Sequence, residues 1–475
     1  MVSELKKTKF TTNSGAEYYY LSDLNIVLSK EGLENAPERD NFYRNLSGFG
    51  KKDAFDDNSH EYTAKDIRTE LLKNGLFELA IEVTSACNFR CKYCIYSGEY
   101  KNQRVHQSKN MEPDIAYKAI DQYLKLITEG ENFNSDRIPV ISFYGGEPLV
   151  NFELIRSCTQ YAKKRYNGNI YFTLTTNASL MNDEIIDFFV KENFNVIVSL
   201  DGYKENHDKN RVDVMGNPTF DKVMSNIKKL YAKQKSPVFV SVVYDYDTDF
   251  VLMNKFFKEN DFITCLSVNG VNPYGTTFLD KYTPEDYDRF NKKVNLLMEE
   301  FLTNVRNSET RPLSFISRVF GDICTSTFMR QYDLNEKNNK FIKYTGSCVP
   351  GNKIFVDYKG DYYICEKISR SFTIGNVLNG LDYEKIAAFV NRYNKYVTTK
   401  CRDCLIKNNC KRCFISMDID EDQIDIPSQS CQKQVANFFS DLKFAYSIFE
   451  LNPKWIGRYY NQYYDTIDKI TAVLK

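Results

Sequence analysis

The chain of 475 residues has no excess of charge of either sign. Lysine and arginine together number 63, as do aspartate and glutamate, so the formal net charge at pH 7 is zero. Binding to nucleic acid or to an anionic membrane surface needs a basic patch, and the balanced composition gives no indication of one. We therefore expect neither nucleic acid nor a membrane as a partner.

Long apolar segments are also absent from the sequence. The first ten residues, MVSELKKTKF, lack the apolar core of a signal peptide. No apolar run approaches the roughly 20 residues of a membrane-spanning helix, and no internal repeat stands out. These absences favour a cytoplasmic globular protein, and the length suggests two or three domains.

Cysteine, by contrast, is frequent, with 13 residues in the chain. In a reducing compartment disulfides are not expected, so clustered cysteines indicate metal ligands. Ten of the 13 fall in two groups, at 87–94 and 348–431, while Cys158, Cys265 and Cys324 are scattered. The sequence therefore predicts two metal-rich regions.

Between these regions the sequence alternates between apolar strands and amphipathic helices. Six predicted strands follow one another, each with a helical segment after it, at 77–84, 137–146, 170–177, 194–202, 237–246 and 263–270. This pattern predicts a parallel sheet covered by helices, either open or curled into a partial barrel. In such folds the chemistry lies at the carboxyl ends of the strands. The first cysteine group and the motifs YGGEP, TTN and SLDG all fall there.

The flanking segments are less regular. A long helix is predicted at 283–305, and beyond about residue 345 we expect a small, loop-dominated region. Before residue 77 the sequence predicts a hairpin within 17–29, a polar loop near 47–59 and a helix at 63–74.

The first cysteine group, Cys87, Cys91 and Cys94, has the spacing C-x3-C-x2-C. Three cysteines can hold a [4Fe–4S] cluster and leave one iron open. A structural zinc ion would need a fourth ligand, for which His106 is the nearby candidate. Spacing alone favours the cluster, because structural zinc usually has paired C-x2-C units.

Together with an aromatic residue before the third cysteine and a GGEP loop after the second strand, this motif resembles the radical S-adenosylmethionine (radical SAM) superfamily. The resemblance covers about residues 77–280. It implies that SAM binds the open iron and is cleaved to a 5′-deoxyadenosyl radical, which removes a hydrogen atom from the substrate.

The resemblance also implies roles for individual residues. Cys87, Cys91 and Cys94 match the catalytic cluster ligands, and Tyr93 matches the aromatic residue against the adenine. Glu147 of the GGEP loop can accept from the SAM ammonium group, and Arg211 can pair with its carboxylate. The remaining expected cofactor contacts are Gly145, Gly146, Pro148, Thr175, Thr176, Asn177, Ser199 and Asp201.

The second cysteine group taken by itself could form a pair of zinc ribbons. Placed after a radical SAM domain, it resembles the SPASM extension, which binds two auxiliary [4Fe–4S] clusters. The family pattern implies a distal cluster on Cys401, Cys404, Cys410 and Cys431. It assigns the nearer cluster to Cys348, Cys365 and Cys413, which gives three clusters in all.

This chain departs from the family pattern in two places. The last pair, Cys410 and Cys413, is C-x2-C rather than C-x3-C, and no cysteine directly after Cys348 completes the nearer cluster. We expect Cys324 to be the fourth ligand, with an iron left open for a substrate thiolate as the alternative.

SPASM-bearing radical SAM enzymes mostly modify ribosomally made peptides or proteins. The long segment before Cys87 and the incomplete nearer cluster resemble the peptide maturases that form thioether links (the sactipeptide and ranthipeptide type). The implied partners are a precursor peptide with a leader sequence and cysteine, and a low-potential electron donor such as flavodoxin or ferredoxin. Formylglycine formation, as in anaerobic sulfatase maturases, carbon–carbon cross-linking and a non-enzymatic electron carrier stay open as alternatives.

The expected fold is therefore α/β, a partial (β/α)6 TIM barrel with smaller domains at both ends. We expect a winged-helix-like, leader-binding domain at 1–75, the radical SAM barrel at 76–310, and a loop-rich SPASM domain at 311–450. A helical tail at 451–475 ends the chain.

Overall fold

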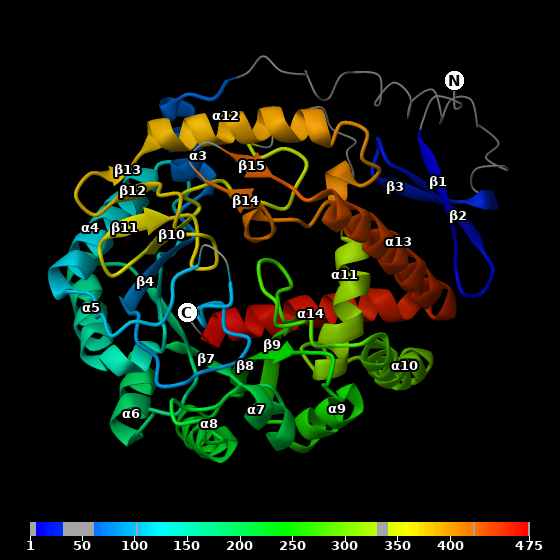
Figure 1. Cartoon of the computed structure of the whole chain (residues 1–475), viewed down its shortest axis with the longest axis horizontal. Coiled ribbons are helices and arrows are strands. Elements are labelled where there is room, and N and C mark those ends of the chain that lie inside the picture. Colours follow the sequence, from blue (N-terminus) through cyan, green and yellow to red (C-terminus); the bar gives the residue numbers. More distant parts are fainter. Residues whose placement is uncertain (1–5, 32–60, 101–102, 330–340, 421–422, 474–475) are drawn as a thin grey trace.

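The protein is built around six parallel strands, each followed by helices that cover the outside of the sheet (Figure 1). The structure, a computed structural model, describes residues 6–31, 61–100, 103–329, 341–420 and 423–473. The strands are β4 (Glu78–Thr84), β5 (Val140–Gly145), β6 (Tyr171–Thr176), β7 (Asn195–Ser199), β8 (Val238–Tyr244) and β9 (Ile263–Gly270). The helices are α4 (Pro113–Gly130), α5 (Phe152–Arg165), α6 (Asp183–Lys191), α7 (Lys204–Asn210), α8 (Phe220–Gln234) and α9 (Phe250–Glu259). The predicted strand–helix alternation and partial barrel are confirmed.

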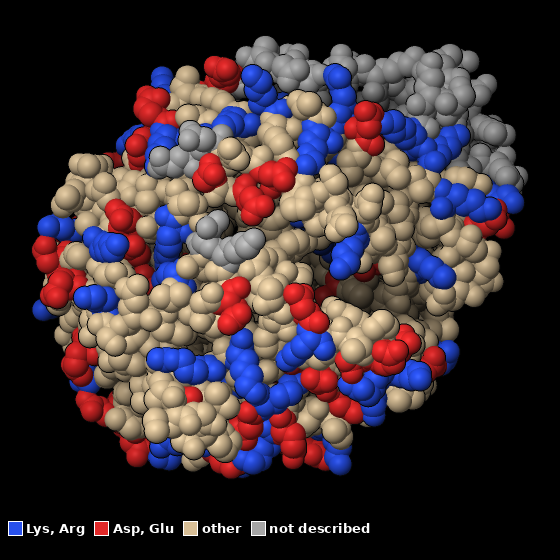
Figure 2. Space-filling model, in the orientation of Figure 1, with Lys and Arg blue, Asp and Glu red and all other residues tan. Residues whose placement is uncertain are grey.

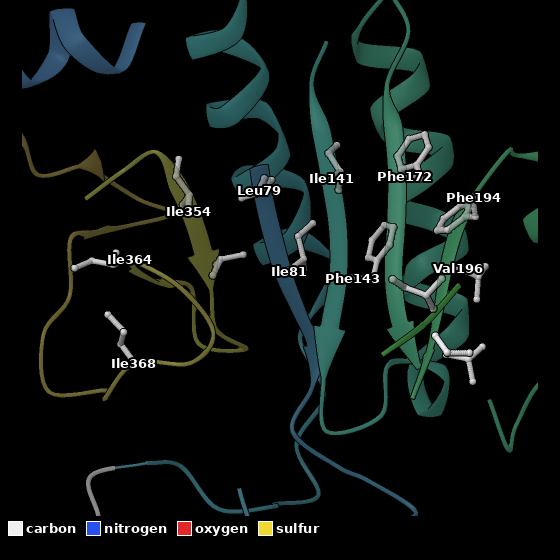
Figure 3. Packing of buried hydrophobic residues seen from close by; sticks show 14 of the residues in the cluster. Leu79, Ile81, Ile141, Phe143, Phe172, Phe194, Val196, Ile354, Ile364 and Ile368 are labelled. Atoms are coloured by element: carbon white, nitrogen blue, oxygen red, sulfur yellow. The ribbon is translucent and has the colours of Figure 1, made fainter. Parts of the chain in front are cut away.

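The two faces of this sheet differ in character. Side chains alternate along each strand between the two faces of the sheet. Leu79 and Ile81 lie on the face toward the helices, in the apolar cluster that Figure 3 shows in part. On the opposite face, Ser199 of β7, Ser241 of β8 and Ser267 of β9 occupy paired positions on neighbouring strands. Bulky side chains fill the layer against the helices, while small hydroxyl side chains line part of the inner face.

The C-terminal region extends the same sheet. β10 (Lys353–Val356) pairs in parallel with β4, and antiparallel strands β11 (Asp361–Tyr363), β12 (Gly375–Asn376) and β13 (Gly380–Leu381) follow. A short hairpin and three helices complete the region: β14 (Asp418–Ile419), β15 (Ile424–Asp425), α11 (Asp322–Phe328), α12 (Tyr383–Lys400) and α13 (Ser428–Leu451). The prediction of a loop-dominated region was therefore wrong for α12 and α13.

The N-terminal strands form a separate antiparallel sheet, with β2 (Glu17–Leu21) between β1 (Lys7–Thr11) and β3 (Ile26–Ser29). The predicted hairpin is thus confirmed. The sheet packs on α13 through an apolar cluster that includes Phe10, Tyr20 and Leu442. The polar loop expected near 47–59 lies outside the described residues.

The predicted helix at 63–74 is confirmed as α3 (Ala64–Asn74), which Thr63 caps at its N-terminus. It packs against α12 and α4, so it lies with the barrel and the C-terminal region. A winged-helix domain that includes this helix and the three strands stays a prediction.

Two further helices close the structure. α10 (Pro284–Arg306) confirms the predicted long helix, and α14 (Pro453–Val473) ends the described chain. Trp455, the single tryptophan, is buried against Phe301 and Tyr459. Among the described helices, none has the length and apolar character needed to cross a membrane. Figure 2 shows acidic and basic side chains interspersed over the visible face.

Candidate active site

The first three cysteines lie in the loop directly after β4, at the carboxyl ends of the barrel strands. Cys87, Cys91 and Cys94 are half-buried. The backbone N–H of Phe89 donates to the Cys87 sulfur and that of Tyr96 to the Cys94 sulfur, each at 3.4 Å. Burial raises the pKa of Cys91 to about 12. The charge of Arg211 offsets part of this rise, and a metal ion bound to the sulfur would favour the thiolate.

The glycine pair after β5 fits against this cysteine loop. The N–H of Gly146 donates to the Thr84 carbonyl at 3.0 Å, and that of Glu147 to the Ala86 carbonyl at 2.8 Å. A Cβ atom on Gly145 would lie 2.3 Å from the Thr84 carbonyl oxygen, and one on Gly146 would lie 2.2 Å from that of Ala86. The absence of side chains at these glycines lets the backbone of the GGEP loop lie close to the cysteine loop. The sequence predicted instead that these glycines contact the cofactor.

Glu147 is fully buried at the centre of this arrangement. One carboxylate oxygen accepts from Thr176 Oγ1 at 2.6 Å and from the N–H of Leu149 at 3.1 Å. The other accepts from the N–H of Asn177 at 2.7 Å. Pro148 begins the short 3₁₀ turn that follows. A carboxylate has about four acceptor sites, so about one remains for an external donor.

Burial raises the pKa of Glu147 from its ordinary value of 4.5 to about 7. Between pH 4.5 and about 7, Glu147 therefore keeps its proton in the folded chain and has lost it in the unfolded chain. Stability should therefore fall as pH rises from about 4.5 to about 7, by about 3 kcal/mol at most, and level off above. Urea unfolding of the metal-free protein across this range should show the slope, and Glu147→Gln should remove that part of it. An unchanged slope in the variant would contradict the assignment.

The end of β6 is tied to the cysteine loop by a second set of hydrogen bonds. Asn177 Nδ2 donates to Asn88 Oδ1 at 2.9 Å, and Asn88 Nδ2 donates to Ser179 Oγ at 2.8 Å. Asn88 and Ser179 did not emerge from the sequence, although Asn88 directly follows Cys87 in the motif. Thr175 and Ser199, two of the predicted cofactor contacts, are half-buried where β6 and β7 end.

Asp201 joins three further elements of the site. Its carboxylate accepts from Tyr93 Oη, from Arg211 Nε at 3.0 Å and from the N–H of Val243 at 3.0 Å. Arg211 Nη1 in turn lies 3.9 Å from the Cys91 sulfur. The structure thus brings Tyr93, Asp201 and Arg211 together beside the cysteine loop, as one interconnected group.

Four of the later cysteines also gather in one place. Cys401 is close enough to Cys404, Cys410 and Cys431 for their charges to raise its pKa, after the larger effect of burial. Burial raises the pKa of Cys410, and the backbone and charge of Arg412 lower it in part. This is the set that the sequence assigned to the distal cluster.

The remaining three form a second group. Cys413 and Cys365 each lie within electrostatic range of Cys348. Burial raises the pKa of Cys365, and the backbone of Lys367 lowers it in part. The cysteine neighbours that these pKa shifts name all fall within the two sets that the SPASM pattern implies.

Comparison with known proteins identifies the barrel. Residues 81–250 match the family model of the Radical SAM superfamily. They form a radical SAM domain.

Relatives of this chain extend the match beyond the barrel. A cysteine-type anaerobic sulfatase-maturating enzyme of Clostridium novyi is 28% identical over 356 residues, which cover 69% of this chain and 86% of that protein. A radical SAM cyclopropyl synthase, TigE of Paramaledivibacter caminithermalis, is 25% identical over 70% of this chain and 65% of its own length. These matches favour the predicted enzyme over the electron-carrier alternative.

The fold is similar to that of the solved structure described as native anSMEcpe with bound AdoMet. The two share 22% sequence identity with a TM-score of 0.57, over 81% of this chain and 99% of that one. This likeness concerns the fold.

The residues at the radical SAM site fit an iron–sulfur cluster. Three thiols are present, and two of them, those of Cys87 and Cys94, accept an N–H from the residue two positions later. Hydrogen bonds to cysteine sulfur favour the thiolate form and tune the potential of such clusters. Cys87, Cys91 and Cys94 would hold the cluster that binds SAM.

His106 lies beside this group, with Nε2 at 3.7 Å from the Cys94 sulfur. Burial lowers its pKa to about 4, so the ring is neutral at pH 7. Within the described part of the chain, no three His, Cys, Asp or Glu side chains are arranged to hold a single metal ion. The arrangement is compatible with a cluster, whose cysteines bind different irons, and offers the zinc alternative no preformed site.

Cys324 has no described contact with the cysteine groups. It is fully buried on α11, and the side chain that most affects its pKa after burial is Asp441. Tyr459 of α14 is also within electrostatic range. No described contact joins Cys324 to Cys348, so its recruitment as the fourth ligand gains no support from the structure.

The aromatic residues after Cys94, whose role the sequence left open, connect the loop to other parts of the chain. Tyr96 is buried and donates to the Glu366 carbonyl at 2.8 Å. Tyr100 is buried and donates to the Asn272 carbonyl at 3.1 Å. Both therefore have packing roles at the edge of the site.

A large cavity of about 660 Å³ lies at the other end of the barrel. It is lined by residues where β7, β8 and β9 begin, among them Asn195, Phe239 and Ile263, and by Trp455 of α14. Because the cysteine loop follows the carboxyl end of β4, this cavity is not part of the radical site.

Proposed function

We propose that this radical SAM enzyme modifies a ribosomally made precursor peptide by joining a cysteine sulfur of the peptide to one of its carbon atoms. The observation that carries the proposal is that Cys348, Cys365 and Cys413 lie near one another, while no cysteine directly after Cys348 completes this set. Three cysteines leave one iron of a [4Fe–4S] cluster open. A substrate thiol bound there would be deprotonated and held in place.

In this proposal the barrel residues bind and orient SAM. Glu147 has about one acceptor site left for the SAM ammonium group, and a cation beside it favours its ionised form. Arg211 is held by Asp201 and can still offer its two terminal nitrogens to the SAM carboxylate. Tyr93, fixed by the same aspartate, is proposed to lie against the adenine, and Thr175 and Ser199 near the ribose. When bound, the cluster and SAM supply a 5′-deoxyadenosyl radical.

The proposed reaction removes two hydrogens from the peptide for each bond. The deoxyadenosyl radical takes one hydrogen atom from carbon and becomes 5′-deoxyadenosine. The cysteine thiol releases its proton, and the sulfur–carbon bond forms. One electron remains, and we assign its uptake to an auxiliary cluster. A flavodoxin or ferredoxin would supply the electron that cleaves SAM.

The N-terminal sheet is proposed to bind the leader sequence. β1 and β3 are its edge strands, and an extended peptide can pair with such an edge. The sheet is joined to the loop of the distal cysteine group, where Lys6 Nζ lies 2.8 Å from Asp403 and Asn409 Nδ2 donates to Tyr20 Oη at 2.8 Å. A leader bound there would lie next to the C-terminal domain.

A second candidate is formylglycine formation on a cysteine or serine of a protein. The sulfatase-maturating relatives favour it, because one of them matches over 86% of its length. The two candidates share SAM cleavage and differ in the product.

The test is incubation of the anaerobically reconstituted protein with SAM, dithionite and peptides translated from short, cysteine-containing reading frames beside its gene. We expect 5′-deoxyadenosine and a peptide lighter by two hydrogens per bond, with a cysteine that no longer reacts with iodoacetamide. A matched peptide with serine in place of that cysteine should show no loss of mass. A product that reacts with an aldehyde probe would favour formylglycine, and an unchanged peptide would overturn both candidates.

A further inference from the structure

A buried group of charged side chains lies beside the cysteine loop, and the proposed chemistry does not use it. Glu82 is fully buried on β4. It shares the inner face of the sheet with Ala80, since Leu79 and Ile81 point to the helices. Arg104 Nε lies 2.6 Å from one carboxylate oxygen of Glu82, and Arg370 Nη2 lies 3.6 Å from the other. One carboxylate therefore faces two guanidinium groups.

Aromatic rings fix both guanidinium groups. The guanidinium carbon of Arg104 lies 3.5 Å from the centre of the Tyr96 ring. That of Arg370 lies 4.4 Å from the ring centre of Phe355 and 4.5 Å from that of Tyr363. Stacking of this kind orients the N–H groups in the plane of each guanidinium without satisfying them.

The hydrogen-bond donors of this group outnumber its acceptors. Among the described residues, Arg104 Nε and the terminal nitrogens of Arg104 and Arg370 are buried without a hydrogen bond of good geometry, and so are both oxygens of Glu82, which the arginines meet as ion pairs. The arginine side chains are only 9% and 17% exposed. Unpaired charged donors at this depth are costly, and the great majority of buried polar groups in proteins have partners. An acceptor from outside the chain would resolve the mismatch.

The balance of charge changes along β4. Near its amino end, Lys353 is shared by two carboxylates, with Glu78 at 3.1 Å and Glu366 at 2.9 Å. Glu82 lies four residues further on, roughly 13 Å along the strand, where two arginines share one carboxylate. The surplus of basic groups is therefore at the end of the strand next to the cysteine loop.

We propose that Arg104 and Arg370 bind a carboxylate side chain of the substrate, an aspartate or glutamate close to the residue that is modified. The proposal rests on the proposed function in taking the ligand to be a peptide. A guanidinium group offers two parallel N–H donors that match a carboxylate, and two such groups converge here. Tyr96, on which Arg104 stacks, is two residues after Cys94, so the carboxylate would anchor the peptide beside the site of the radical.

The test compares two blocked peptides that differ in one atom group. Acetylated and amidated Gly-Glu-Gly-Cys-Gly and its glutamine counterpart are titrated into the reconstituted holoenzyme with SAM and without reductant, and binding is followed by calorimetry. We expect the glutamate peptide to bind about tenfold more tightly, because charge-assisted hydrogen bonds are stronger than neutral ones. Equal affinity, a preference for glutamine, or no binding of either peptide would overturn the proposal.

Variants locate the effect. Arg104→Met and Arg370→Met should each bring the ratio of affinities close to one, and Arg370→Lys, which keeps the charge without the two parallel donors, should give an intermediate ratio. Arg318→Met is the matched control, since Arg318 is 16% exposed and ion-paired with Asp322, and it should keep the wild-type ratio. If a methionine variant does not fold, the ratio of affinities for the two peptides in the wild type and in Arg370→Lys still tests the proposal. A control that loses the preference equally would overturn the assignment.

The two proposals fail in different ways. A preference for glutamate without any cross-linked product in the incubation described above would support the carboxylate site and count against the proposed reaction. Cross-linked product together with equal binding of the two peptides would support the reaction and overturn the carboxylate site.

Discussion

Replacing Cys91 with alanine should reduce the formation of 5′-deoxyadenosine from SAM to the background level. Cys91 is the middle cysteine of the motif, and its sulfur lies 3.9 Å from Arg211 Nη1. It therefore contacts the group formed by Tyr93, Asp201 and Arg211. Without this thiolate, two cysteines would remain to hold the cluster that binds SAM. If all three clusters bind, the variant should lose about a third of the iron. Chromatography of deoxyadenosine and an iron assay of the reconstituted protein measure both effects.

The control for this variant is Cys158→Ala. Cys158 is a buried cysteine on α5, where burial raises its pKa to about 12, and no assigned cysteine group includes it. We expect normal iron content and normal deoxyadenosine, with at most a slightly lower melting temperature, because only a small apolar side chain is shortened. Equal losses in the two variants would show that the role assigned to Cys91 is wrong.

The barrel could be predicted because its signals are local. Each strand from β4 to β9 is a short apolar run, and the helices between them show a helical period. The carboxyl ends of parallel strands meet at one edge of the sheet, so the sequence alone predicts that the cysteines, the GGEP loop and the end of β6 lie close together.

The C-terminal region was harder to predict because its order depends on distant partners. β10 and β11 have four and three residues, too short for a clear pattern, and they exist as strands because β4 offers an edge. α12 did carry a signal, with Ile386, Phe389, Val390 and Tyr393 buried at helical spacing. This helix lies between Cys365 and Cys401, in a region where the clustered cysteines favoured loops.

Within the site, the sequence grouped the cysteines but did not indicate which other residues lie next to them. The SPASM pattern implied one set for Cys401 and Cys431, and the structure brings them together. The pairing of Glu82 with Arg104 and Arg370 joins residues far apart in the chain, which no local pattern indicates. No local pattern indicates the close contact between Gly146 and the Ala86 carbonyl either.

Substitution of Gly146 by alanine should displace the cysteine loop. The new Cβ would lie 2.2 Å from the Ala86 carbonyl oxygen and 2.9 Å from Cys87 Cβ. The first of these atoms is backbone, so no side-chain rotation can relieve the overlap, and the strain should cost about 3 kcal/mol. We expect a melting temperature lower by several degrees, lower occupancy of the cluster that binds SAM, and little deoxyadenosine.

Gly457→Ala is the matched control, because a Cβ there meets nothing within 4 Å and the residue lies inside α14. Alanine favours the helix over glycine by about 1 kcal/mol, so this variant should melt at the same or a slightly higher temperature and keep its iron. Partial recovery of iron in Gly146→Ala at low temperature would agree with a displaced loop, since strain that shifts the loop leaves its thiols intact. A Gly146→Ala protein with normal iron, melting and SAM cleavage would show that the loops can separate without consequence, and the contact between the GGEP loop and the cysteine loop would then have no role in forming the site.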